Sequence, residues 1–231
     1  MVVGIYALHV TSLYGYVWFA FAGALAAGVA VFLLGAVSPD GPTPVTLALA
    51  GVAVSALLGA LTSALVLLDT RTLDAFRFWA VGSLAGRDGE VVAQVAPFLC
   101  AGLVLALLNT SGLNLLSLGD DVATALGANL AATRGVGMAA ITLLIGAATA
   151  ACGPIAFVGL VVPHVCRVFT GPDYRWLVPA SGLAGAVLLL AADVVGRIVA
   201  RPGELEVGIV LTLVGAPFFV ALVRRRRLVA L

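Results

Sequence analysis

The sequence contains little charge and no lysine. Asp, Glu, Lys and Arg make up 10% of its 231 residues, and all 12 basic residues are arginine. Soluble domains carry roughly 25% charged residues, so this composition excludes a single soluble domain. Hydrophobic residues reach 62%, and the mean hydropathy is +1.18. One soluble core cannot hide this apolar excess, and the composition therefore predicts a polytopic membrane protein.

The common motifs of catalysis are also missing. There is no GxxxxGK[ST] loop, which excludes ATP binding by that route, and there is no HExxH pair. The stretch Ser117-Leu118-Gly119-Asp120 departs from the GxGD aspartyl-protease motif at its first position. Asp120 and Asp121 are adjacent, so their carboxylates do not face each other on a helix. We expect no catalytic residue and no cofactor.

Cysteine is scarce and its spacing is uninformative. Cys100, Cys152 and Cys166 lie in or at the edge of apolar runs, without a CxxC or Cys/His pattern. This distribution predicts small buried side chains without a metal site.

Long apolar runs dominate what is present. Seven are predicted as transmembrane helices: Tyr16–Val37, Val45–Leu68, Val91–Leu108, Gly135–Ala151, Ile155–Phe169, Leu177–Val195 and Val207–Val223. Val2–Val10 has about half the length that a span needs and is expected to end a further span. Thr72–Val81 is predicted as a short interfacial helix. The expected fold class is all-α, one polytopic transmembrane helical bundle over residues 1–231, with seven full spans and one partial.

The second span carries a stripe of small residues. Gly51, Ser55, Gly59 and Ser63 recur every four residues and share one helix face. Such a face lets another helix approach closely. It serves either ordinary packing in the bundle or a pathway-lining or dimer contact.

The interval Asn109–Arg134 is polar and lies between apolar runs. Ser117-x-x-Asp120 resembles a capping box, with Asp in place of Glu. Asp120 and Asp121 then fall in the first turn, where they complement the helix dipole. Gly127 suits the left-handed residue after the last turn. The interval is therefore predicted to contain one helix of about nine residues.

This predicted helix has an apolar face formed by Leu118, Val122, Ala125 and Leu126. A helix so short is marginal alone, so the face must pack on something. It either packs under its own bundle or docks on a cytoplasmic partner. Asn129 is expected to cap the helix that follows.

Arginine placement sets the expected orientation. With the C-terminus inside, the inner segments hold Arg134, Arg167, Arg175 and Arg224–Arg227. The interval 109–134 is then cytoplasmic.

Ionisable residues lie near the ends of two predicted spans. His164 follows Pro163 near the inner end of a span, where it either caps the local backbone or contacts substrate or metal. Asp193 and Arg197 are four residues apart, which favours a structural pair on one helix.

Four ordered stretches carry a family resemblance: LNLLSLGDDVATALG, GPIAFVGLVVPHVCR, GPDYRWLVPASGLAGAVLLLAADVVGR and GELEVGIVLTLVGAPFF. From about Val2 to Arg227 the chain resembles the FecCD-like permeases, the membrane subunits of type II ABC importers for ferric siderophores, haem and cobalamin. The second stretch contributes these motif residues: Gly153, Pro154, Phe157, Gly159, Pro163, His164 and Arg167.

The resemblance implies about ten spans per chain and a dimer of permeases. It also implies two cytoplasmic ATP-binding subunits and an extracytoplasmic binding protein, with no nucleic acid. The element that couples to the ATPase would contain Ser117, Leu118, Gly119, Asp120, Asp121, Val122, Leu126 and Gly127. The spans starting at Val45 and Val207 would line the pathway. In the latter, Gly215 and Pro217 would serve either the pathway or helix packing. The connection with Arg197, Arg201 and Glu204 would receive the binding protein.

Two departures from the family pattern matter. Glu206 stands where the family usually has proline, and about three spans are expected upstream of Val2–Val10. The chain is thus predicted to be a permease subunit in the bacterial cytoplasmic membrane, with ferric siderophore as the commonest family cargo. A secondary transporter, which would work without an ATPase, and a non-functional fragment are the alternatives.

Overall fold

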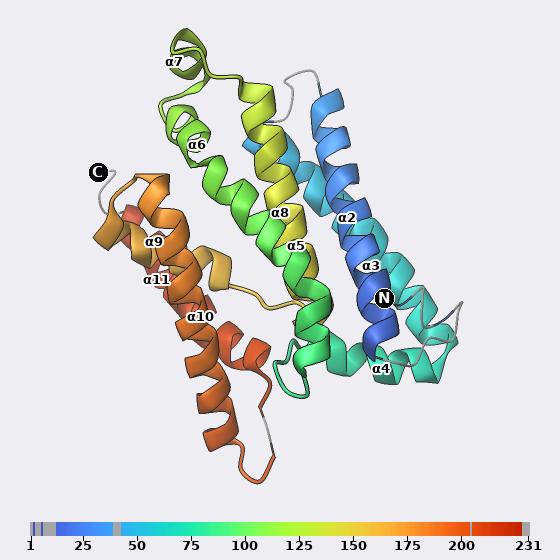
Figure 1. Ribbon diagram of the computed structural model, residues 1–231. Coiled ribbons are helices and arrows are strands. Elements are labelled where there is room, and N and C mark those ends of the chain that lie inside the picture. Colours follow the sequence, from blue (N-terminus) through green and yellow to red (C-terminus); the bar gives the residue numbers. More distant parts are fainter. Residues whose placement is uncertain (1, 3–5, 7–12, 39–42, 204, 228–231) are drawn as a thin grey trace. The chain divides into compact units, whose positions relative to one another are not determined.

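The computed structural model describes residues 2, 6, 13–38, 43–203 and 205–227, and the regular structure in these ranges is helical (Figure 1). The helices are α2 (Leu13–Val37), α3 (Pro44–Leu68), α4 (Thr70–Ala80), α5 (Gly89–Leu108), α6 (Thr110–Leu116), α7 (Asp120–Ala125), α8 (Leu130–Cys152), α9 (Val158–Thr170), α10 (Tyr174–Val199) and α11 (Val207–Arg227). The predicted all-α class is confirmed. The predicted partial span Val2–Val10 lies largely outside the described residues.

Within the described ranges, five helices are long and apolar enough to cross a membrane: α2, α3, α5, α8 and α10. A bilayer core needs about 20 helical residues, and the apolar segments of these helices have 20 to 26. Many of their large side chains are exposed in the isolated chain, among them Val37, Leu67 and Leu183. Apolar surface on this scale is stable against lipid or another chain.

One predicted span is shorter in the structure. The prediction for Ile155–Phe169 was wrong as a full span, because α9 begins at Val158 and has 13 residues, about 20 Å of helix. Gly153 takes a φ of +77° and Pro154 has no N–H to donate, so the chain leaves the helix there. The predicted last span, Val207–Val223, lies within α11, which runs from Val207 to Arg227.

One compact unit contains α2, α3, α4, most of α5 and the middle of α8. Its helices approach closely at small residues. A Cβ on Gly28 would lie 2.7 Å from Oγ1 of Thr142, so these two helices meet almost backbone to side chain. The rings of Phe21 and Phe98 pack with centroids 4.3 Å apart, which joins α2 to α5.

Helix α4 confirms the predicted short helix, with slightly different ends. Asp69 caps its first turn, since one carboxylate oxygen accepts the N–H of Thr72 at 2.9 Å and its hydroxyl at 2.6 Å. Thr72 is fully buried. The cap separates the end of α3 from the start of α4, so two helices follow with one residue between them.

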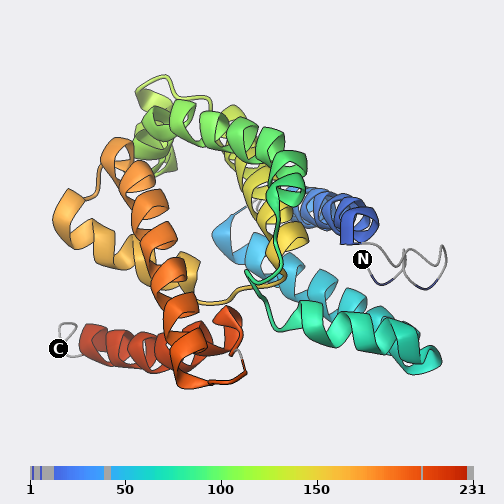
Figure 2. The ribbon, with the colours of Figure 1, turned by 60° about the horizontal axis from the view of Figure 1, so that its bottom comes forward.

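The second unit contains α6, α7, α9, α10 and α11, the C-terminal end of α5 and both ends of α8. Within it α10 packs against both α9 and α11 (Figure 2). Its buried apolar residues form two clusters: Val162, Cys166 and Leu177, and Ala192, Val207, Val210 and Leu211.

All three cysteines are free thiols. Cys166 is buried as predicted, and Cys152 is half-buried. The prediction was wrong for Cys100, which is exposed on α5. A thiol is apolar enough to face lipid as readily as protein, so apolar surroundings in the sequence did not imply a protein core.

Candidate docking face and helix junction

The polar interval 109–134 folds into two short helices, α6 and α7, where one was predicted. Ser117 is the C-cap of α6, and its Oγ donates to the carbonyl of Asn114 at 2.6 Å. Gly119, with a φ of +97°, precedes α7. The predicted capping box was therefore wrong, because Ser117 closes the first helix and does not open the second.

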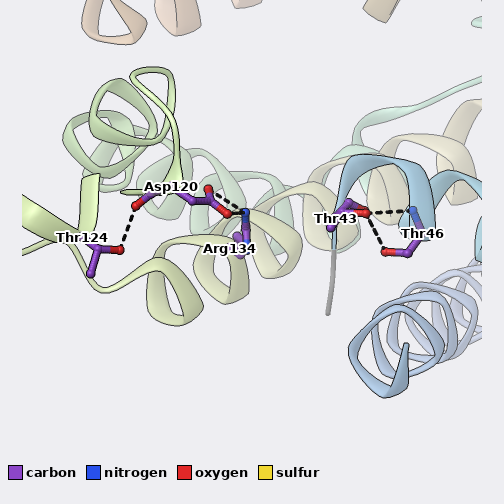
Figure 3. A network of polar contacts seen from close by, with 5 residues as sticks. All are labelled: Thr43, Thr46, Asp120, Thr124 and Arg134. Atoms are coloured by element: carbon purple, nitrogen blue, oxygen red, sulfur yellow. Dashed lines mark hydrogen bonds and ion pairs between the residues drawn. The ribbon is translucent and has the colours of Figure 1, made fainter. Parts of the chain in front are cut away.

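Asp120, in the first turn of α7, is ion-paired with Arg134 on α8 (Figure 3). Nη2 of Arg134 lies 2.7 Å from one carboxylate oxygen and 2.9 Å from the other. Thr124 donates its hydroxyl to the main-chain carbonyl of Asp120 at 2.8 Å. The side chain of Arg134 is 25% exposed and that of Asp120 52%. The pair thus fixes the start of α7 to the N-terminal end of α8. Asp121 shares the first turn, as predicted, and is exposed.

The predicted apolar face of α7 is exposed. Leu118, Val122 and Leu126 are 56%, 48% and 60% exposed, whereas Ala123 is fully buried. The small side chain of Ala123 is therefore buried, whereas the three large apolar side chains are exposed. In the described part of the chain this face does not pack under its own bundle, and docking on a partner stays a prediction.

The end of α7 follows its prediction. Gly127 has a φ of +81°, in the left-handed region that glycine adopts without strain, and its N–H donates to the carbonyl of Thr124 at 2.9 Å. Asn129 then caps α8, accepting the N–H of Ala132 at 3.0 Å. The two helices are consequently separated by a short, well-bonded turn.

Helix α6 is bound to the loop between α9 and α10. Nδ2 of Asn114 donates to Oδ1 of Asp173 at 2.6 Å, and its Oδ1 accepts the N–H of Tyr174 at 2.9 Å. The N–H of Arg175, at 2.9 Å, and then the Asn114 amide stabilise the ionised carboxyl and lower the pKa of Asp173. We call α6, α7 and residues 170–176 the docking end of this unit.

The other end of α8 meets two segments distant in sequence. The N–H of Ser83 donates to the carbonyl of Cys152 at 2.8 Å, and the N–H of Gly208 donates to that of Gly82 at 3.1 Å. A Cβ on Gly208 would overlap the carbonyl oxygen of Val81. Only glycine therefore lets α11 begin this close. We call Val81–Ser83, Cys152–Pro154 and Val207–Gly208 the helix junction.

Two motif residues bound the extended stretch between α8 and α9. Gly153 and Phe157 have φ of +77° and +67°, and for phenylalanine this region costs roughly 1–3 kcal/mol. A Cβ on Gly215 of α11 would lie 2.6 Å from Cβ of Phe157. Gly215 is thus a helix-packing residue, the second of the two roles predicted for it. The break predicted at Gly153–Pro154 is confirmed.

The other motif residues lie on α9. Pro163 cannot bond to the carbonyl of Gly159. His164 is half-buried, and its imidazole makes no hydrogen bond to the described part of the chain, so the expected capping is not observed. The described residues also contain no cluster that could hold a metal ion. Arg167 lies over the ring of Tyr174, 5.8 Å from its centroid, and so belongs to the docking end.

The small-residue face of α3 is open. No atom beyond the local helix lies within 4 Å of a Cβ built on Gly51 or Gly59, and Ser55 and Ser63 are exposed. The described chain therefore does not use this face for its own packing, and the pathway or dimer contact stays a prediction. Pro217 on α11 is exposed as well.

The residues predicted to receive a binding protein are partly placed. Nε of Arg197 donates to Oδ2 of Asp193 at 2.8 Å, which confirms the pair on one helix. Arg201 is exposed, and Glu204 lies outside the described residues.

Sequence reasoning missed four structural partners. Arg134 counted only as a marker of orientation, although a lone charge near the start of an apolar helix, shortly after two acids, was a signal for an ion pair. Asn114 and Asp173 are 59 residues apart, and nothing local in the sequence links them. Gly208 looked like one small residue among many, because its role depends on a distant carbonyl.

Comparisons with known proteins agree on one family. The chain matches the FecCD transport family over residues 1–225. It is 48% identical to the ferric enterobactin transport system permease protein FepD of Escherichia coli (strain K12), covering 90% of this chain and 62% of FepD. It is 42% identical to the Fe(3+)-citrate import system permease protein YfmD of Bacillus subtilis (strain 168), covering 93% and 63%.

A solved structure described as an inward-facing conformation of a metal-chelate type ABC transporter is also similar. It shares 32% identity and a TM-score of 0.85, over 97% of this chain and 71% of that one. The chain spans under two thirds of the length of FepD and YfmD. With a family match over nearly all its residues and several membrane-length helices, the chain is an integral membrane protein of the FecCD transport family.

Proposed function

We propose that this chain forms the permease subunit, or the larger part of one, of an ATP-driven importer of an iron chelate in the bacterial cytoplasmic membrane. The observation that carries the proposal is the family match over residues 1–225. Ferric siderophore is the proposed cargo, since relatives are named for ferric enterobactin and Fe(3+)-citrate. The apolar spans of α3 and α11 carry no charge, which suits a bulky chelate that passes without tight binding.

The docking end is the proposed contact with the cytoplasmic ATP-binding subunits. Val122 on α7 and the flanking Leu118 and Leu126 are exposed, and the start of α7 is held by an ion pair. Burying one such leucine contributes about 1.5–3 kcal/mol. The coupling element Ser117–Gly127 and the C-terminal arginines Arg224–Arg227 are then cytoplasmic, in keeping with the arginine bias.

The connection after α10 is the proposed site for an extracytoplasmic substrate-binding protein. Arg201 is exposed there, while Arg197 is held by Asp193. Rim charges act mainly on association rate and its salt dependence. Arg201→Ala should therefore flatten the salt dependence of docking. An unchanged dependence would remove Arg201 from the interface, and Glu204 is proposed to act beside it.

A second permease copy is the proposed neighbour of α3. The open stripe Gly51, Ser55, Gly59 and Ser63 gives a helix from another chain room to approach. The first turns of α11 border an open apolar hollow of about 330 Å³, lined by Val81, Gly208, Ile209, Thr212 and Leu213. This hollow is proposed to border the transport pathway.

Uptake of radiolabelled ferric siderophore into proteoliposomes tests the proposal. The 231-residue chain is reconstituted with the ATP-binding subunit and the binding protein encoded beside it. We expect uptake that requires both partners and stops when the P-loop lysine of the ATP-binding subunit is replaced. Uptake without that subunit would indicate a secondary transporter. Absence of uptake, restored only by a chain with additional N-terminal spans, would show that this chain is an incomplete subunit.

A further inference from the structure

We propose that Arg134 is a positioning residue that holds α7 on the end of α8, so that α8 carries a displacement of α7 to the helix junction at its other end. The proposal rests on the proposed function, in which a cytoplasmic partner bound to α7 supplies the displacement.

The hold on α7 depends on one side chain from α8. Helix α7 has six residues, too few to be stable alone. Its buried contact is the methyl group of Ala123, which fixes little orientation. Asp120 places both carboxylate oxygens within 2.9 Å of Nη2 of Arg134. By contrast, Arg77–Asp74 and Arg197–Asp193 each join residues of one helix. The Asp120–Arg134 pair therefore transmits position between helices.

Helix α8 is suited to transmit a displacement from one of its ends to the other. It runs without a break from Leu130 to Cys152, with no proline among its 23 residues, and is about 33 Å long. Sharp bends arise at proline, at glycine or serine pairs, at bulges or at an inserted group. Helix α8 has no proline and stays helical through Gly135 and Gly137, so it is proposed to move as one body. A displacement of Arg134 consequently displaces Cys152 as well.

Main-chain bonds continue the connection beyond α8. The carbonyl of Cys152 accepts from Ser83, and the carbonyl of the neighbouring Gly82 accepts from Gly208 at the start of α11. Gly82 and Gly208 leave no space for a side chain at this contact. Since the junction is closely packed, it has little room to absorb a shift. Movement of α8 should reach the first turn of α11.

Hydrogen–deuterium exchange of the purified chain in nanodiscs tests the hold on α7. In Arg134→Gln we expect amides of residues 117–127 to exchange about two- to fivefold faster than in wild type. Asp120→Asn should have the same effect, and the double variant should add nothing further, because both changes remove one interaction. Arg77→Gln, which removes an ion pair within α4, is the matched control. Unchanged exchange in Arg134→Gln would overturn the hold.

The second measurement tests transmission. With the ATP-binding subunit bound, exchange of residues 81–88 is compared between its nucleotide-free and nucleotide-trapped states. We expect a difference in wild type that is lost in Arg134→Gln while the subunit still co-purifies. A difference that persists in Arg134→Gln would overturn transmission through α8. Failure of the wild-type chain to bind the subunit would instead overturn the proposed function, and with it transmission, without altering the result for the hold.

Discussion

The docking end and the helix junction, at opposite ends of α8, are held together by different groups. At the docking end side chains make the contacts: Asp120 with Arg134, and Asn114 with Asp173. At the junction the main chain makes them, through the N–H groups of Ser83 and Gly208. The first set is partly exposed, whereas Gly82, Ser83 and Val207 are buried.

This difference suits the two ends to different tasks. An exposed ion pair contributes roughly 0–1 kcal/mol, so it can be rearranged when a partner binds. A buried main-chain hydrogen bond costs more to break, because its groups lose their partners away from water. The docking end is therefore adjustable and the junction is not. This asymmetry favours movement that enters at α7 and passes through the junction without disrupting it.

The largest expected effect concerns the side of the membrane on which each end lies. Pro172→Cys marks the docking end, and Arg201→Cys marks the connection between α10 and α11. Both are made in a chain whose native cysteines are replaced by serine. An impermeant maleimide should label Arg201→Cys in intact cells and Pro172→Cys only after permeabilisation, because the arginine bias places the docking end inside. The reverse pattern would take α7 away from any cytoplasmic ATPase.

The junction should tolerate almost no added volume. Gly208→Ala puts a methyl group against the carbonyl oxygen of Val81. The obstacle is main chain and cannot rotate away, so we expect a loss of about 3 kcal/mol, at the upper end for overpacking. Thermal unfolding in detergent measures it. Gly182→Ala on α10, where the new methyl group meets open space, is the control and should not destabilise. Equal melting temperatures for both variants would mean that the junction is not close-packed.

The docking face should tolerate substitution in the chain itself but not in the complex. Leu126→Asp changes an exposed side chain, so insertion and folding should be unaffected. Binding of the ATP-binding subunit should weaken roughly tenfold to a hundredfold, because a buried leucine is lost and a carboxylate is desolvated. Co-purification at graded detergent-solubilised concentrations measures this. Leu126→Ala should give a smaller loss, and wild-type binding by Leu126→Asp would remove this residue from the interface.

The long spans could be predicted from the sequence, and so could the break at Gly153–Pro154, but not where the helix resumes after it. The predicted span Val45–Leu68 matches α3 to within one residue, because a long apolar run is terminated by Pro44 and Asp69. The run at Ile155–Phe169 is also mainly apolar, yet its first residues, before Val158, are not helical. The left-handed φ of Gly153 and Phe157 depends on the packing of Phe157 against Gly215, which hydropathy does not report.

The candidate site shows the same division. The four-residue spacing of Leu118, Val122 and Leu126 predicted one apolar helix face. All three side chains are exposed, but only Val122 lies within α7. The capping box failed since Ser117 has two possible helices to cap, and spacing alone does not choose between them. Ion pairs such as Asp120–Arg134 require the tertiary path of a connecting turn. Some local contacts were thus predictable, such as the Asn129 cap and the Asp193–Arg197 pair, whereas the contacts between elements were not.

The smallest expected effect is a pH dependence confined to the docking end. The N–H of Arg175 and the amide of Asn114 lower the pKa of Asp173 below its ordinary value of 3.8. A carboxyl group with a lowered folded-state pKa stabilises the fold fully above its unfolded-state pKa, and this stabilisation is lost as the pH falls through the folded-state value. The contact between α6 and residues 170–176 should therefore keep its strength from neutral pH to about pH 4 and weaken below it. Thermal unfolding of wild type and Asp173→Asn from pH 7 to pH 3 measures the difference. Asparagine can still cap α10 but does not titrate, so the advantage of wild type should be constant at higher pH and shrink as the pH falls below about 4. A gap that is equally large at pH 3 would show that the charge of Asp173 does not support this contact.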